Sequence, residues 1–227
     1  MVFVSVATRA RRTWPWTTSA LTLVALIAFL VLATMGEAER QVAVAEFGAV
    51  PNDLVGETGS RPVSSEIFTL ATALFVHADW PHLIGNLAFL LIFGLPAERM
   101  LGSRRVLALF MLGGVLANLG AALLARASEH PIVGMSGAVS ALVGAYIALF
   151  PRARLGLVLP LGLFFEFVRI PALALIGFWI LVQALFAWLA PEMGRVAWGA
   201  HLVGFATGIS FALASRGAIA RRWRNAR

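Results

Sequence analysis

Cysteine and lysine are both absent from this chain of 227 residues, and charged residues of any kind are few. Without cysteine there is no disulfide framework, no thiolate zinc site and no cysteine nucleophile. Charged residues make up 13% of the chain and hydrophobic residues 60%, whereas soluble domains carry roughly 25% charged residues. This composition excludes a water-soluble globular protein and indicates one that lies in a membrane.

Long apolar runs dominate the rest of the sequence, and about 20 apolar residues suffice for a helix to cross the hydrocarbon core. We therefore predict an all-α membrane protein, a bundle of six transmembrane helices within residues 17–215. A short N-terminal segment (1–16) precedes it, a basic tail (216–227) follows it, and a polar external stretch of about 36–80 joins the first two spans. The predicted spans are residues 17–35, 81–96, 106–125, 136–150, 171–190 and 198–214.

The apolar segment 155–169 is not counted as a seventh span. It contains Pro160, Glu166 and Arg169, and ionised residues within the bilayer are costly. An odd number of spans would also break the distribution of charge along the chain. We predict that this segment is a loop lying at the membrane interface.

The basic residues are all arginine and gather at the ends of the apolar runs. With six spans, fourteen of the 18 arginines fall on the side that holds both termini. The positive-inside rule then places both termini in the cytoplasm. The first apolar run is longer than the 7–15 residues typical of a signal-peptide core, so we expect a retained helix.

The same charge distribution indicates the partners of the chain. Arg221, Arg222 and Arg224 near the C-terminus are expected to contact anionic lipid head groups, and no nucleic acid is expected. The exclusive use of arginine and the single membrane domain favour a bacterial inner membrane. Nothing in the sequence indicates an oligomeric state.

Polar residues occur at one depth in three predicted spans, where the bilayer discourages them. At 1.5 Å per residue, Ser136 and His201 each lie about 22 Å above the cytoplasmic end of their spans. His82 lies about 24 Å and Asn86 about 18 Å above that end. This common depth indicates one shared site below the outer surface. The segments concerned are HLIGN (82–86), GMSG (134–137) and AHLVGFATG (200–208).

Small residues explain how the fourth and sixth predicted spans can pack closely. In the sixth span small residues recur at every fourth position, which forms a stripe where another backbone can approach. The fourth span offers glycines as a counter-surface. The predicted packing glycines are Gly134, Gly137, Gly204 and Gly208.

Ser136 and His201 form the pair with nucleophilic chemistry. A serine hydroxyl becomes an effective nucleophile when a neighbouring base takes its proton, and His201 is the histidine at this depth on the interface. No Asp or Glu occurs at this level in any span, so we predict a dyad rather than a triad. His82 and Asn86 share one helix face, and with the backbone N–H of Ser136 they are predicted to form an oxyanion hole.

Each of these elements also has a structural interpretation when taken alone. Serine is common in transmembrane helices as a hydrogen-bonding residue between helices, and a Gly-x-Ser-Gly in a glycine-rich span is typical of packing. His82 and His201 can be buried structural histidines or members of a transporter's proton relay. We interpret His77 and His130, in or near external loops, as structural or incidental.

Taken together, the motifs resemble the rhomboid family over roughly residues 69–208, in the family's motif order. FVHADWPHLIGN is similar to the second-span signature, VGMSGAVSALVGAY to the fourth-span G-x-S-G segment, and AHLVGFATG to the sixth-span segment. The resemblance implies a serine endopeptidase that needs no cofactor or metal, with Ser136 as nucleophile and His201 as general base. It also implies cleavage of transmembrane segments of membrane-protein substrates near the outer face, through an acyl-enzyme.

The chain departs from the family pattern at two places. Phe68 and Thr69 stand where some members have a tryptophan–arginine pair, and Ser140 stands where some members have a tyrosine that stacks on the histidine. Other protease classes lack support, because there is no H-E-x-x-H zinc motif and both aspartates, Asp53 and Asp79, are external. A transporter or a non-catalytic, chaperone-like membrane protein stays open as an alternative, because polar residues within spans also suit ion paths. A transporter would usually show an inverted repeat, and none is visible.

Overall fold

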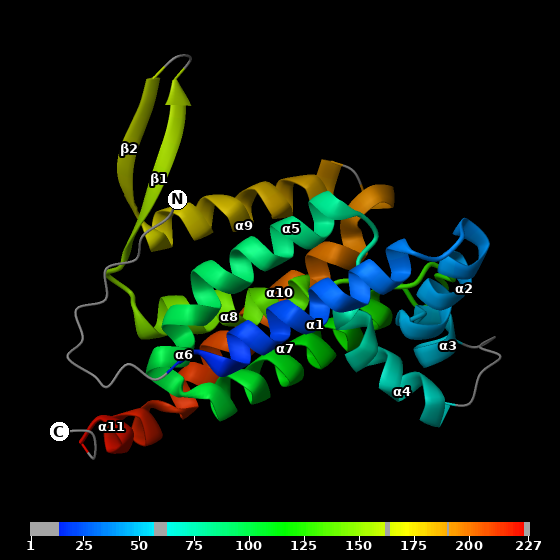
Figure 1. Ribbon diagram of the computed structural model, residues 1–227, viewed down its shortest axis with the longest axis horizontal. Coiled ribbons are helices and arrows are strands. Elements are labelled where there is room, and N and C mark those ends of the chain that lie inside the picture. Colours follow the sequence, from blue (N-terminus) through cyan, green and yellow to red (C-terminus); the bar gives the residue numbers. More distant parts are fainter. Residues whose placement is uncertain (1–13, 57–62, 162–163, 190, 225–227) are drawn as a thin grey trace.

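The computed structural model describes residues 14–56, 63–161, 164–189 and 191–224. The axes of most of the long helices are roughly aligned and the helices form a bundle, from which a β-hairpin projects (Figure 1). The elements at the six predicted spans are α1 (Trp16–Ala33), the continuous helix formed by α5 (Trp80–Phe89), η2 (Leu90–Gly94) and α6 (Leu95–Leu101), α7 (Ser103–Leu124), α8 (Ser136–Leu149), α9 (Ala172–Leu189) and α10 (Pro191–Ala214).

Three of these helices are long and apolar enough to cross a membrane. They are α1, the continuous helix Trp80–Leu101 and α7. Apolar but shorter stretches, among the described residues, are Glu66–Phe75, Ser136–Leu149, Ala172–Val182 and Trp198–Ala214. The fold is therefore mainly helical, as predicted, and at least these three helices have the dimensions of membrane spans.

The second predicted span is longer than the sequence pattern indicated. We expected it to end at Pro96, but the helix continues to Leu101 and ends at Gly102, whose φ is 87°. Proline lacks the N–H that a regular helix uses, and the wider π-helical turn η2 directly before α6 accommodates this break. At the other end, the Asp79 carboxylate accepts a hydrogen bond of 2.7 Å from the His82 backbone N–H and caps α5.

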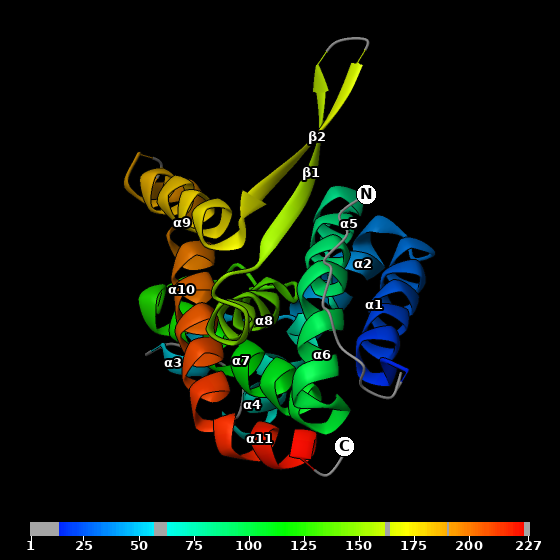
Figure 2. The same cartoon turned by 90° about the vertical axis from the view of Figure 1, so that its left-hand side faces the viewer.

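The segment predicted as an interfacial loop is a β-hairpin, so the fold is not purely helical. β1 (Arg154–Leu161) pairs antiparallel with β2 (Phe164–Pro171). The backbone N–H of Ala172 donates to the Ala153 carbonyl at 2.8 Å and closes the base of the hairpin. Leucine, valine and phenylalanine favour extended backbone when they pair across strands, and Pro160 disfavours a helix. The hairpin points away from the bundle in both views (Figures 1 and 2).

The polar stretch between the first two spans folds into short helices at one end of the bundle. The basic tail forms α11 (Arg216–Arg224) at the opposite end (Figure 1). Residues 1–13 of the predicted N-terminal segment and 225–227 of the tail lie outside the described residues. The short elements are α2 (Glu37–Phe47), α3 (Pro51–Val55), α4 (Val63–Thr72) and the 3₁₀ turn η1 (Ala73–Phe75).

Helix α8 is the centre of the bundle (Figure 2). Every residue from Gly137 to Tyr146 is buried, which is typical of a helix surrounded by other helices. The α8 and α10 backbones approach so closely that a Cβ at Gly204 or Gly208 would collide with the carbonyl oxygens of Gly137 and Ala141. Small residues at this crossing therefore set the distance between the two helices.

Candidate active site

A cavity of about 240 Å³ lies between α5, α8, α9 and α10. Ser136, His82, Asn86 and His201 all line it. The structure thus brings together the four polar side chains that the sequence singled out, from three separate helices. The other residues of the lining are Pro81, Gly85, Phe89, Val139, Ser140, Val143 and Trp179.

Ser136 is the first residue of α8 and follows the N-cap residue Met135. The first backbone N–H groups of a helix have no partner within that helix, and this end carries a partial positive charge. The half-buried Ser136 side chain therefore lies beside donors that favour an anion. An oxyanion formed next to its Oγ would be stabilised at this helix end.

Gly134 packs directly on the imidazole of His82. Its φ of 98° favours glycine, and its backbone N–H donates to the Ala73 carbonyl at 2.8 Å. A Cβ at this position would lie 2.5 Å from His82 Nε2. We predicted Gly134 as a helix-packing residue, but it precedes α8 and contacts a side chain of the cavity instead.

Asn86 lies one helical turn after His82 on the same face of α5. Its Nδ2 donates to the His82 carbonyl oxygen at 3.0 Å, and the residue is 7% exposed. An amide nitrogen carries two hydrogens, so one donor remains after this bond. The arrangement fixes the amide against its own helix with the cavity on its other side.

His77 lies behind His82, with ring centroids 5.2 Å apart and planes at 64°. We interpreted it as a structural or incidental histidine in or near an external loop, and it is 2% exposed. Nδ1 lies 3.3 Å from the Phe75 carbonyl oxygen, while Nε2 has no hydrogen-bond partner among the described residues. Burial, and then the charge of His82, lower the pKa of His77 to about 4.

Two tryptophans that the sequence reasoning did not select flank His201. The Trp179 ring centroid lies 5.7 Å from that of His201 at an interplanar angle of 34°. The Trp198 centroid lies 5.8 Å away at 76°. Trp198 precedes His201 by three positions in α10, a spacing that places side chains on one helix face and could have identified it. Trp179 comes from α9, and no local pattern connects it to His201.

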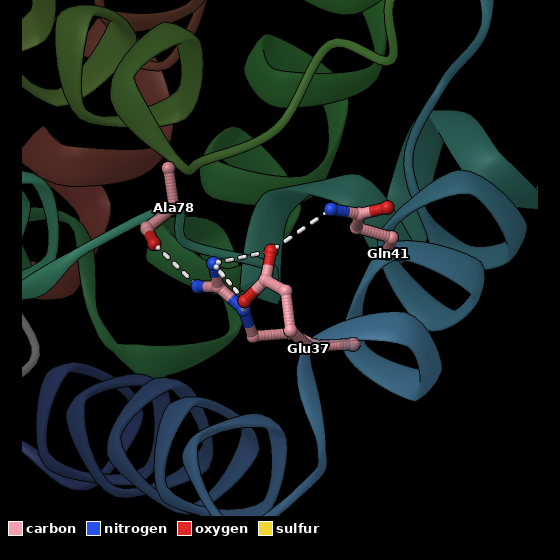
Figure 3. A network of polar contacts seen from close by, with 4 residues as sticks. Glu37, Gln41 and Ala78 are labelled. Carbon is pink, nitrogen blue, oxygen red and sulfur yellow. Dashed lines mark hydrogen bonds and ion pairs between the residues drawn. The ribbon is translucent and has the colours of Figure 1, made fainter.

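The turn before α5 is held by a polar network from α2 (Figure 3). Arg40 Nη1 donates to the Ala78 carbonyl at 3.1 Å, and Arg40 forms an ion pair of 3.1 Å with Glu37. Gln41 Nε2 donates to Glu37 Oε1 at 2.9 Å. The Gln41 hydrogen bond and the Arg40 charge lower the pKa of Glu37. These contacts tie α2 to the backbone that leads into the cavity.

A second cavity of about 390 Å³ adjoins the first and is lined by apolar side chains. It lies between α9 and the continuous helix of α5 and η2, with Leu155 of β1 among its lining residues. Phe89, Val143 and Trp179 line both cavities. The cavity that holds Ser136 and His201 therefore neighbours an apolar cavity, and these three side chains border both.

Comparison with known proteins identifies the family of this chain. The family model described as the Rhomboid domain matches residues 64–217. The chain belongs to the rhomboid family. The resemblance seen in the sequence motifs is thus confirmed, and the apolar helices together with this membership make the chain an integral, multi-pass membrane protein.

Relatives of the chain occur in bacteria and eukaryotes. Rhomboid protease GluP of Bacillus subtilis is 29% identical over 129 residues, which cover 56% of this chain and 24% of that protein. Rhomboid protein 1, mitochondrial, of Saccharomyces cerevisiae is 32% identical over 157 residues, 66% of this chain and 42% of that protein. Rhomboid-related protein 3 of Homo sapiens is 30% identical over 135 residues, 59% and 32% respectively. The matched regions span less than half of each relative.

Proposed function

We propose that this rhomboid-family chain is an intramembrane serine endopeptidase that cleaves transmembrane segments of membrane proteins near their outer ends. The proposal rests on one observation: Ser136, His201, His82 and Asn86 line the same cavity. A nucleophile, a base and hydrogen-bond donors in one concave site are the parts that acyl transfer requires. The name of one relative, Rhomboid protease GluP of Bacillus subtilis, agrees with this assignment.

The proposed reaction begins when His201 accepts the hydroxyl proton of Ser136 and Oγ attacks the scissile carbonyl carbon. The resulting oxyanion accepts hydrogen bonds from the Ser136 backbone N–H and from the side chains of His82 and Asn86. His201 then gives its proton to the leaving amide nitrogen, and the C–N bond breaks to leave an acyl ester on Ser136. Water, deprotonated by His201, hydrolyses the ester and restores the serine.

The apolar cavity supports an apolar substrate. A transmembrane segment approaching between α5 and α9 would meet apolar side chains before reaching Ser136. Its carbonyls are occupied by helical hydrogen bonds, so cleavage should favour segments with helix-weakening residues near the outer end. No metal or organic cofactor enters any of these steps.

We also propose that the six helices cross the membrane with both termini in the cytoplasm. The arginine distribution supports this orientation, and α11 and the short helices α2–α4 lie at opposite ends of the bundle. The membrane would be a bacterial inner membrane with anionic lipids near the tail. Because the chain has no cysteine, single cysteines at Ser215 and Ala127 can be labelled with a membrane-impermeant maleimide. Labelling of Ala127→Cys from outside the cell and Ser215→Cys only after lysis is expected, and the reverse would overturn the orientation.

The catalytic proposal is tested with purified protein in liposomes. A single-span substrate carrying a helix-weakening Gly–Gly pair near its outer end is offered to the wild type, to Ser136→Ala and to His201→Ala. Cleavage by the wild type alone is expected. A fluorophosphonate probe should label the wild type at Ser136 and neither variant.

Ser140→Ala is the matched control, because Ser140 lines the same cavity and is 2% exposed. It should keep cleavage within about threefold of the wild type, as expected for a group with no step in the reaction. Cleavage that survives in Ser136→Ala, or that disappears equally in Ser140→Ala, would contradict the assignment of the nucleophile.

A further inference from the structure

The His201 imidazole lines a cavity whose other described lining residues are Pro, Gly, Val, Phe, Trp, Ser, Asn and His. Among the described residues, no Asp or Glu side chain lines the cavity. In serine hydrolases with a triad, the carboxylate holds the imidazole in one orientation and stabilises the imidazolium formed during the reaction. The second side-chain torsion of histidine is otherwise broad and roughly two-fold. A dyad therefore benefits from another means of holding the ring.

The two tryptophan rings beside His201 have the geometry to do this. They approach the imidazole from different helices and at different angles, Trp179 tilted at 34° and Trp198 closer to perpendicular at 76°. Both centroid distances, 5.7 and 5.8 Å, fall within the 4.5–7 Å range of favourable aromatic pairs. Two rings beside the imidazole, in different orientations, restrict its rotation more than one ring does. Their π-systems also attract a cation.

A third ring, which also lines the cavity, extends this series of contacts to α5. Phe89 on α5 lies 6.2 Å from Trp179, with planes at 37°. The series Phe89, Trp179 and His201 therefore links α5, α9 and α10 across the cavity. Trp179 is held in place by its neighbour on α5 as well as by α9, and Trp198 is fixed by its position in the helix that carries His201.

We propose that Trp179 and Trp198 are positioning residues for the dyad: their rings hold the His201 imidazole in the orientation that takes the Ser136 proton and stabilise the imidazolium that results. This inference rests on the proposed function. It assigns to two aromatic side chains the part that a carboxylate has in a triad. Some rhomboid sequences have an aromatic residue at the position of Ser140, but the serine of this chain has no ring that could stack on His201.

The test measures how fast a small fluorophosphonate probe labels Ser136, since that rate depends on activation of the serine and not on docking of a transmembrane substrate. Trp179→Leu and Trp198→Leu should each slow labelling about tenfold. Trp179→Phe and Trp198→Phe, which keep a ring, should remain within about threefold of the wild type. In substrate cleavage, Trp198→Leu should lower kcat and leave KM unchanged, because an effect on activation alone appears in kcat.

Trp188→Leu on α9 is the matched control, because Trp188 is 77% exposed and is not among the residues lining either cavity. It should be labelled at the wild-type rate. Thermal unfolding in detergent shows which variants are folded. If a leucine variant is not folded, the methionine variant at the same position is tested in its place. Wild-type labelling rates in folded variants at both positions overturn the positioning role alone. An unlabelled wild type overturns the proposed protease function instead.

Discussion

The backbone of Gly134 lies against the imidazole of His82, so close that a Cβ at position 134 would come within 2.5 Å of Nε2. The glycine precedes the N-cap Met135 of α8, and its backbone N–H is fixed to the Ala73 carbonyl. One residue therefore sets both the start of the helix that carries Ser136 and the position of the imidazole across the cavity.

Substituting Gly134 by alanine should damage the site more than the fold. The left-handed φ costs alanine about 1–2 kcal/mol, and the new methyl group must displace His82. We expect Gly134→Ala to lower the rate of fluorophosphonate labelling at least about tenfold while the protein remains folded. Gly177→Ala is the control, because a Cβ at Gly177 meets nothing within 4 Å. Equal labelling rates for the two variants would contradict the role given to Gly134.

A buried carboxylate joins the first helix to the rest of the bundle. Glu98 on α6 is 3% exposed and accepts hydrogen bonds from the backbone N–H groups of Thr17 and Thr18, at 2.9 and 2.8 Å. It also accepts from Thr18 Oγ1 at 2.6 Å and from Ser103 Oγ at 2.5 Å. Orphan N–H groups at the start of α1 are thus satisfied by a residue about 80 positions away.

Glu98→Gln should therefore destabilise the bundle. One carboxylate oxygen is replaced by a donor that faces other donors, and charge-assisted bonds become neutral, which together cost about 1–3 kcal/mol. Thermal unfolding in detergent should show a lower midpoint for this variant than for Glu46→Gln, a substitution at an exposed position on α2. Equal midpoints would show that the Glu98 contacts add nothing to stability.

Much of this molecule could be predicted from sequence because its signals are local. Apolar runs located the six helices, and His82, Asn86, Ser136 and His201 stood out since polar residues are rare within spans. The hairpin and Trp179 could not be found in this way. Strand pairing depends on residues on both sides of a turn, and the contact between Trp179 and His201 depends on how α9 packs beside α10. The prediction that the second span ends at Pro96 was wrong because a π-helical turn, which has no simple sequence signal, lets the helix continue.

The buried His77 should make the fold sensitive to acid. Its pKa is about 4 in the folded protein and about 6.5 when the chain is unfolded, so between these values the unfolded state binds the extra proton. Stability contributed by neutral His77 is present above pH 6.5 and is lost as the pH falls toward 4. His77→Phe removes this titration. Between pH 7.5 and pH 5 the unfolding midpoint of this variant should fall less than that of the wild type. The two decreases should differ by at least about 2–4 °C.

His130→Phe serves as the comparison for His77→Phe, because His130 is exposed. This variant should keep the full acid-induced decrease of the wild type. A decrease of equal size in His77→Phe and the wild type would show that other groups account for the acid sensitivity. Each midpoint is measured in the same detergent, so that only the protonation of the protein differs.

The β-hairpin should lie in the head-group region of the membrane. Within the part of the chain that the structure describes, each of its two strands is paired along one edge only, and unpaired backbone groups are too costly in hydrocarbon. A lone two-stranded sheet is marginal in water, and the strands of this hairpin are largely apolar. The head-group region satisfies both conditions, because it can hydrogen-bond the strand edges and also accommodate apolar side chains. Arg152 and Arg154 are exposed at the base of the hairpin, where anionic lipid phosphates would pair with them.

Single cysteines carrying an environment-sensitive fluorophore test this placement, because the chain has no native cysteine to remove. In liposomes, a label at Val158→Cys on β1 should be quenched most by phospholipids with a nitroxide near the head group. A label at Leu112→Cys, an exposed position near the middle of α7, should be quenched most by a nitroxide deep in the acyl chain. A label at Ala127→Cys, between α7 and α8, should be quenched by neither, because we place it in external water.

If the Val158 label followed the Leu112 pattern, the edges of the hairpin would have to be paired by another chain, since unpaired strand edges are not tolerated in hydrocarbon. If it followed the Ala127 pattern, the hairpin would stand in water and its apolar strands would need a soluble partner to cover them.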